Sequence, residues 1–102
     1  MAVKAGSKIT IASTGTAKAL SPTTLNARWV QVQSAATNNA AGQNLGDSGV
    51  TGPGGSGTNP GVVMAPGGVQ FLPWDGCAAG YDLAQINVNG TTGDVFYVLF
   101  DY

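Results

Sequence analysis

The segment Tyr81–Tyr102 constrains the fold more than any other part of this chain. Two runs rich in β-forming residues, Tyr81–Val88 and Val95–Tyr102, are joined by the short connection Asn89–Asp94, which begins with an Asn-Gly pair. This arrangement predicts a β-hairpin. Because aromatic and branched aliphatic residues fill most of the second run, we expect that strand to be central and covered on both faces. The two expected buried rows are Phe96, Val98 and Phe100 on one face and Val95, Tyr97 and Leu99 on the other.

Near the N-terminus, Lys8–Ala12 alternates polar and apolar residues, which is the pattern of a half-buried strand with Ile9 and Ile11 inward. Thr16–Leu20 is its expected hairpin partner. Before Lys8 the chain does not show this alternation. Residues 1–8 are therefore predicted to form a small, flexible N-terminal arm.

Ala27–Ser34 is the next predicted strand, with Val30 and Val32 directed into the core. Trp29 lies on the opposite face of that strand. Large aromatic residues dominate both cores and interfaces, so Trp29 is either covered by another sheet or offered to a partner.

A second hairpin is predicted where Gly61–Met64 and Val69–Leu72 flank Ala65–Gly68. The Pro-Gly-Gly sequence of that connection supplies the fixed φ and the permissive φ that a tight turn needs.

The stretch 42–61 is rich in glycine and contains Pro53 and Pro60, so only Gln43–Gly46 is expected to form a brief strand within it. A glycine-rich loop loses much conformational entropy when it becomes ordered. We therefore expect it to become fixed only against a partner.

These patterns predict an all-β fold, a small antiparallel β-sandwich or barrel of about seven short strands. The expected organisation is an N-terminal arm over residues 1–8 and a single β domain over 9–102, with a long Gly-rich loop at about 42–61. At 102 residues the chain has the length of one domain.

Charge is sparse in this chain. Charged residues make up 9% of it, with four basic and five acidic residues, no histidine and a net charge of −1, against about 25% charged residues in ordinary soluble domains. No basic stripe exists to neutralise phosphates, so we expect no nucleic-acid partner. A sparsely charged surface suits a protein packed in an assembly, because solubility as a monomer normally depends on charge.

The absence of apolar segments restricts where the protein is expected to be located. No apolar run approaches the roughly 20 residues of a membrane helix, and the start lacks the apolar core of a signal peptide. We therefore expect no membrane partner and a product that stays in the cell that makes it or leaves by lysis. Cys77 is the one cysteine, so no internal disulfide is possible, and it is expected to be a small buried residue.

Two motifs with catalytic or cofactor associations do not carry that chemistry here. Gly46–Gly49 spells the Gly-Asp-Ser-Gly of serine proteases, but the chain has no histidine to act as the base. Gly52–Gly57 matches the dinucleotide-binding glycine pattern, but Pro53 and Pro60 leave no helix to follow it.

The aspartates are dispersed, which argues against a calcium site. We expect no catalytic, cofactor-binding or metal-binding residues, and no enzyme activity.

Six short stretches combine turn and core residues in a distinctive order: Ala27–Gln33 (ARWVQVQ), Leu45–Ser48 (LGDS), Val62–Pro73 with its Pro-Gly-Gly, Tyr81–Leu83, Ile86–Gly90 and Gly93–Asp94. Together they resemble small structural proteins of tailed bacteriophages, in particular capsid decoration (cement) proteins. The 40–60 region is longer and richer in glycine than that pattern requires.

The resemblance implies a virion component, made in the host cytoplasm and located on the outer surface of the capsid. Its implied partner is the major capsid protein, and it implies a homo-oligomer, with a trimer favoured, that braces the shell. Within that hypothesis the expected capsid or subunit contacts are the charged residues Lys4, Lys8 and Arg28 and the apolar anchors Trp29 and Trp74.

A receptor- or carbohydrate-binding module of a phage head or tail fibre is the alternative function. Exposed aromatic residues together with Asn, Gln and Asp would serve such a module. The number of copies in each particle separates the two hypotheses, because a cement protein occurs in many copies and a fibre tip in few.

Overall fold

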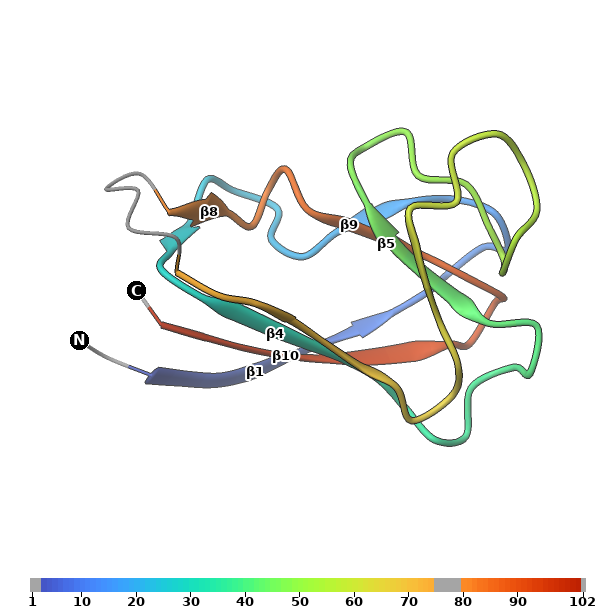
Figure 1. The fold of residues 1–102 in the computed structure, drawn as a ribbon, viewed down its shortest axis with the longest axis horizontal. Helices are drawn as coiled ribbons and strands as arrows, with labels where there is room; N and C mark the ends of the chain where they lie inside the picture. The colour runs from blue at the N-terminus through green and yellow to red at the C-terminus, as the bar shows by residue number, and fades with distance from the viewer. Residues whose placement is uncertain (1–2, 75–79, 102) are drawn as a thin grey trace.

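The computed structural model describes residues 3–74 and 80–101 and confirms the prediction of an all-β sandwich. Its ten short strands are more numerous than the sequence predicts, and all the strand pairs are antiparallel. They form two four-stranded sheets and a separate two-stranded ribbon, β3 (Asn26–Ala27) with β8 (Tyr81–Asp82). In each four-stranded sheet the first and last strands are edge strands that do not pair with each other. The sandwich is therefore open and not a barrel (Figure 1).

We call the two larger sheets A and B. Sheet A has the order β1–β10–β4–β7, with strands Val3–Thr10, Val95–Asp101, Val30–Ser34 and Val69–Leu72. Sheet B has the order β2–β9–β5–β6, with strands Lys18–Ala19, Asn87–Asn89, Gln43–Gly46 and Val62–Met64.

Except for β5 and β6, which pair with each other in sheet B, strands that are consecutive in the chain lie in different sheets. The connections β1–β2, β4–β5, β6–β7 and β9–β10 each lead from one sheet to the equivalent position of the other. Both predicted hairpins, and the predicted pairing of Thr16–Leu20 with Lys8–Ala12, are therefore wrong. The turns exist, but they are arches between sheets.

The connection after β9 shows why no hairpin forms there. The N–H of Gly93 donates to the carbonyl of Ile11 at 2.8 Å, and the N–H of Ile11 donates to the carbonyl of Asp94 at 2.8 Å. The N–H of Gly15 donates to the carbonyl of Gly90 at 3.1 Å. The segment after β1 thus pairs with backbone groups that a hairpin would need for itself.

The Pro-Gly-Gly turn is confirmed as a turn. The N–H of Gly68 donates to the carbonyl of Ala65 at 2.8 Å, and Gly67 has a φ of 82°. Proline at the second position and a positive φ at the third are the features of a type II turn. The turn leads from β6 at the edge of sheet B to β7 at the edge of sheet A.

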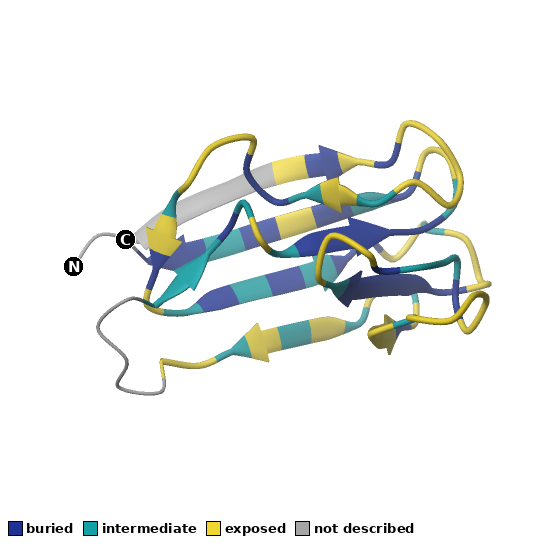
Figure 2. Cartoon of the chain, turned by 90° about the horizontal axis from the view of Figure 1, so that it is seen from above, coloured by how far each residue is buried: buried dark blue, intermediate teal, exposed yellow. Residues whose placement is uncertain are grey.

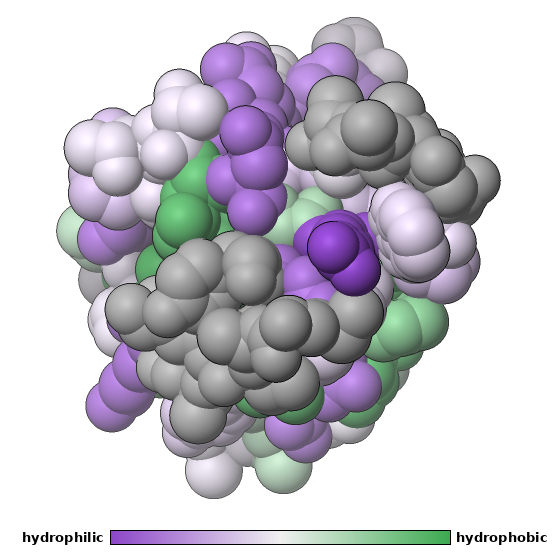
Figure 3. Space-filling model, turned by 90° about the vertical axis from the view of Figure 1, so that its left-hand side faces the viewer, coloured by the Kyte–Doolittle hydropathy of each residue, from purple (hydrophilic) through white to green (hydrophobic). Residues whose placement is uncertain are grey.

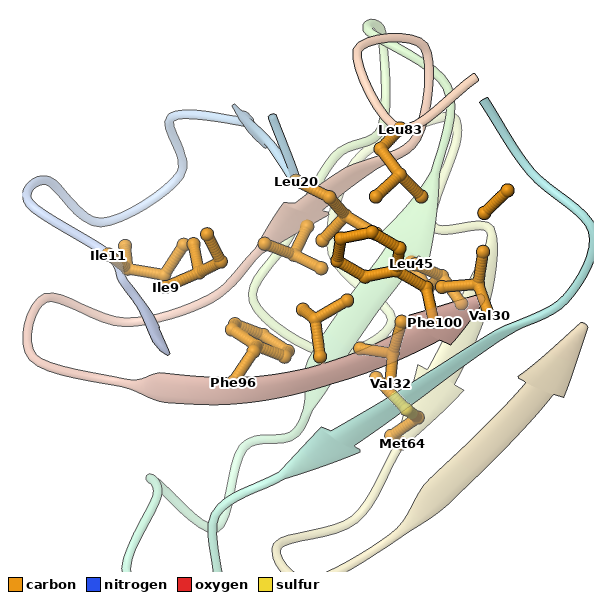
Figure 4. Packing of buried hydrophobic residues seen from close by; sticks show 13 residues of the cluster. Ile9, Ile11, Leu20, Val30, Val32, Leu45, Met64, Leu83, Phe96 and Phe100 are labelled. Atoms are coloured by element: carbon orange, nitrogen blue, oxygen red, sulfur yellow. The ribbon is translucent and has the colours of Figure 1, made fainter. Parts of the chain in front are cut away.

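The core lies between the two sheets and contains most of the residues predicted for it (Figure 4). Ile9, Ile11, Val30 and Val32 are buried, as are Phe96, Val98 and Phe100. The second predicted row is not buried, because Tyr97 is 48% exposed and Val95 and Leu99 are only partly covered. The central strand β10 is therefore covered on one face only.

The N-terminal arm predicted over residues 1–8 is also corrected. From Val3 onward the chain forms β1, which pairs with β10 in a register that places Lys8 opposite Tyr97. A register shift lies between Lys4 and Ser7. Strand β10 needs a neighbour for the backbone groups that do not face β4, and β1 provides it.

The Gly-rich loop after β5 is fixed by the protein itself, contrary to the expectation that it needs a partner. The side-chain amide of Asn44 donates to the carbonyls of Gly54 and Pro60 at 2.6 and 2.8 Å. That of Asn89 donates to the carbonyl of Val50 at 2.9 Å. Asn44 and Asn89 are opposite each other in the β5–β9 register, so the loop lies over the outer face of sheet B (Figure 1).

A buried carboxylate ties the two sheets together at one end. Asp94 accepts hydrogen bonds from the backbone N–H groups of Asn39 and Thr91, both at 2.9 Å, and from the Gln43 side chain at 3.0 Å. Gln43 in turn accepts from the hydroxyl of Ser34 on β4. This network of hydrogen bonds links β5 of sheet B to β4 of sheet A, in addition to the apolar core.

Candidate functional site

Large apolar side chains are exposed mainly in one part of the chain. Six such residues are 43 to 52% exposed, and five of them lie between residues 62 and 74. The six are Val62, Val63, Val69, Phe71, Trp74 and Tyr97. No residue from Ser48 to Trp74 is charged. The uncharged edge formed by β6 and β7 is therefore the main apolar surface of the described chain.

Phe71 and Tyr97 extend this surface across the outer face of sheet A. The register aligns Tyr97 with Gln33 and Val69, and it aligns Leu99 with Gln31 and Phe71. Two rows of side chains thus cross β10, β4 and β7 on the side away from the core. In Figure 2 the residues alternate between buried and intermediate along β4 and between exposed and intermediate along β7, the outermost strand of the sheet.

Three of the predicted contact residues meet at one end of this face. The rings of Trp29 and Phe71 have centroids 5.8 Å apart and are tilted by 41°. The guanidinium carbon of Arg28 lies 5.3 Å from the centre of the Trp74 ring, a cation–π geometry. We call Arg28, Trp29, Phe71 and Trp74 the aromatic end of sheet A.

Antiparallel pairing explains this meeting. Arg28 and Trp29 precede β4, and Trp74 follows β7, so the start of one strand lies beside the end of the other. Trp29 is half-buried against Phe71, and no second sheet of the described chain covers it. Of the two alternatives that the sequence leaves open, the structure therefore excludes coverage by another sheet within the described residues.

The other two predicted contact residues lie elsewhere. Lys4 and Lys8 belong to β1, at the edge of sheet A opposite to β7. Lys8 is exposed. The five predicted residues therefore do not form one cluster, and Lys8 lies opposite Tyr97 on the far side of the outer face. The sequence does not indicate which strand occupies which edge of the sheet.

The two outer faces of the sandwich differ. The outer face of sheet B carries the loop that Asn44 and Asn89 hold, whereas no segment of the described chain is hydrogen-bonded across the outer face of sheet A. The end of the molecule that carries both termini has a mixed surface of hydrophilic and hydrophobic groups (Figure 3).

Sequence reasoning missed Val62, Val63, Val69, Phe71 and Tyr97 as surface residues. The signal that could have found the first four is the absence of charge from Ser48 to Trp74, because edge strands are normally protected by charges. The prediction that Cys77 is buried lies outside the described residues.

Other kinds of site are not found in the part of the chain that the structure describes. Within residues 3–74 and 80–101 no pocket is present and no three metal-ligating side chains of His, Cys, Asp or Glu come together. Among the same residues no helix has the length and hydropathy to cross a membrane.

Comparison of the chain with protein-family models, with curated proteins and with solved structures finds no match.

Proposed function

We propose that this chain is a structural protein of a phage virion, a decoration or cement protein that binds the shell of the major capsid protein from outside. The observation that carries the proposal is the apolar surface of the β6–β7 edge, which has no charged residue and continues across the outer face of sheet A to Tyr97. Exposed apolar patches of this kind mark protein interaction sites. The sequence resemblance to decoration proteins supplies the identity of the partner.

The aromatic end is the expected centre of that contact. Trp, Tyr and Arg residues contribute most of the binding energy in protein interfaces, and Arg28, Trp29 and Trp74 lie together there. Lys4 and Lys8 are expected to contribute less, because β1 lies at the edge of sheet A opposite to β7 and the aromatic end. Lys8 lies opposite Tyr97, at the far limit of the apolar surface.

Shell binding tests this proposal directly. Capsids assembled without the chain are mixed with the purified protein, and the bound copies are counted by single-particle imaging. We expect many copies on each shell, increased resistance to rupture, and binding weakened about tenfold or more by Trp74→Ala or Phe71→Ser. Thr58→Ala, an exposed change on the glycine-rich loop, is the matched control. Absence of binding to the shell would contradict the proposal.

A receptor- or carbohydrate-binding module is the second candidate. The exposed rings of Phe71, Trp74 and Tyr97 favour it, because aromatic rings offer apolar faces on which sugar rings can stack. A small copy number confined to a fibre, together with glycan binding that Trp74→Ala abolishes, would support this function in place of the first.

A further inference from the structure

We propose that β7 pairs edge to edge with β7 of a second copy of this chain, antiparallel and about a twofold axis, so that two A sheets become one. This inference does not rest on the proposed function. It depends on the unpaired backbone groups of β7 and on the absence of charge in that strand, and it requires no capsid.

The backbone of β7 offers unpaired hydrogen-bonding groups. The N–H of Ser34 donates to the carbonyl of Gly68 at 2.9 Å. Hydrogen-bonded pairs alternate along an antiparallel ladder, so Gln70 and Leu72 also direct their backbone groups to β4. Val69 and Phe71 therefore direct theirs away from β4, to the side where no strand of the described chain lies.

The other edge strands are protected in ways that β7 is not. Strand β1 carries the exposed Lys8 and a register shift, and β2 is two residues long and carries the exposed Lys18. Strand β6 is three residues long. Strand β7 has four residues, none of them charged or proline. Charges, bulges and shortness are the means by which proteins prevent edge pairing, so β7 is the edge left open to it.

A second copy fits this edge because the strand is complementary to itself. With the twofold axis at Gln70, Val69 of one copy lies opposite Phe71 of the other. Both residues direct their backbone groups outward, so each such pair exchanges two hydrogen bonds. Their side chains meet on the outer face as an aromatic and β-branched pair, which is a favourable cross-strand combination.

Charge favours self-pairing in the same way. A twofold interface brings each residue close to its own equivalent, so a charged strand would repel itself. The uncharged segment from Ser48 to Trp74 creates no such repulsion. Because only four residues of each chain pair, we expect weak association, with a Kd of order 10 μM to 1 mM.

Sedimentation equilibrium over a wide concentration range tests the pairing. We expect a monomer–dimer equilibrium that Val69→Pro weakens about tenfold or more, because proline removes an N–H that only the second copy would use. Tyr97→Lys is the matched control, since it adds charge and removes apolar area on the same face but on the central strand. It should leave the dimer essentially unchanged.

Amide hydrogen exchange of the unmodified chain gives a second readout that needs no variant. Protection of the Val69 and Phe71 amides should rise with protein concentration, whereas the Gln70 amide, already directed to β4, should be protected at every concentration. A chain that stays monomeric, a trimer, or a dimer lost in Tyr97→Lys but kept in Val69→Pro would overturn the pairing. Failure to bind capsids while the dimer persists would overturn the proposed function alone.

Discussion

Asn44 of β5 and Asn89 of β9 lie opposite each other, and each side-chain amide donates two hydrogen bonds to backbone carbonyls of other segments. Asn44 binds Gly54 in the middle of the glycine-rich loop and Pro60 near its end, and Asn89 binds Gly15 and Val50. Two neighbouring side chains thus attach two loops to one face of sheet B.

Replacing these asparagines should loosen the loop. We expect Asn89→Ala to lower the free energy of unfolding by about 1–3 kcal/mol, because buried carbonyls lose their donor. Asn44→Asp should also be destabilising, since a carboxylate would face two carbonyl oxygens. Denaturant unfolding and limited proteolysis of the loop measure both effects. Equal stability of Asn89→Ala and the exposed control Thr58→Ala would contradict this account.

The glycines of the loop should differ sharply in their tolerance of alanine. Gly54 has a φ of +61°, and an added Cβ would collide with the carbonyl oxygen of Ala41. Gly55 has no positive φ and no atom within 4 Å of an added Cβ. We expect Gly54→Ala to cost about 2 kcal/mol or more and Gly55→Ala to change stability by less than about 0.5 kcal/mol. Thermal unfolding of the two variants is the measurement, and similar losses in both would disprove the close packing.

Asp94→Asn should weaken the bridge between the sheets. The carboxylate accepts three hydrogen bonds, and an amide in its place would direct an N–H group at one of the donors. We expect a loss of about 2 kcal/mol, seen as a lower denaturant midpoint. Asp47→Asn is the control, because Asp47 is exposed. An unchanged midpoint for Asp94→Asn would show that the network contributes little.

Asp101→Asn, in contrast, should stabilise the protein. Asp101 is fully buried, and neither of its carboxylate oxygens has a hydrogen-bond partner among residues 3–74 and 80–101. Burying an uncompensated charge is costly, so removal of the charge should raise the free energy of unfolding by about 1 kcal/mol or more. Chemical denaturation at neutral pH measures the change, and a destabilised variant would mean that the charge is compensated.

The sequence predicted which side chains are buried better than it predicted which strands pair. Alternation along Ala27–Ser34 and Val95–Tyr102 identifies Val30, Val32, Phe96 and Phe100 correctly, because burial follows from period and hydrophobicity. Pairing was wrong, because an Asn-Gly or Pro-Gly-Gly sequence specifies a turn without specifying whether it joins strands within a sheet or between sheets.

The loop and the candidate site were also predicted only in part, because both depend on contacts between segments that are distant in the sequence. Glycines such as Gly54 indicate flexibility when read along the chain, whereas in the fold they permit close approach to a neighbouring backbone. Arg28, Trp29 and Trp74 were recognised singly as contact residues, but Phe71 was not placed among them. Their proximity depends on the pairing of β4 with β7, which local sequence does not determine.

The four arches have a consequence for how the protein is made. The central strand β10 pairs with β1 and β4, which lie far earlier in the chain. Sheet A therefore cannot be completed on the ribosome before residues 95–101 have been synthesised, because β10 joins β1 to β4. Because almost every strand pair joins distant segments, folding should be slow, and the nascent chain should depend on protection from aggregation until that strand is available.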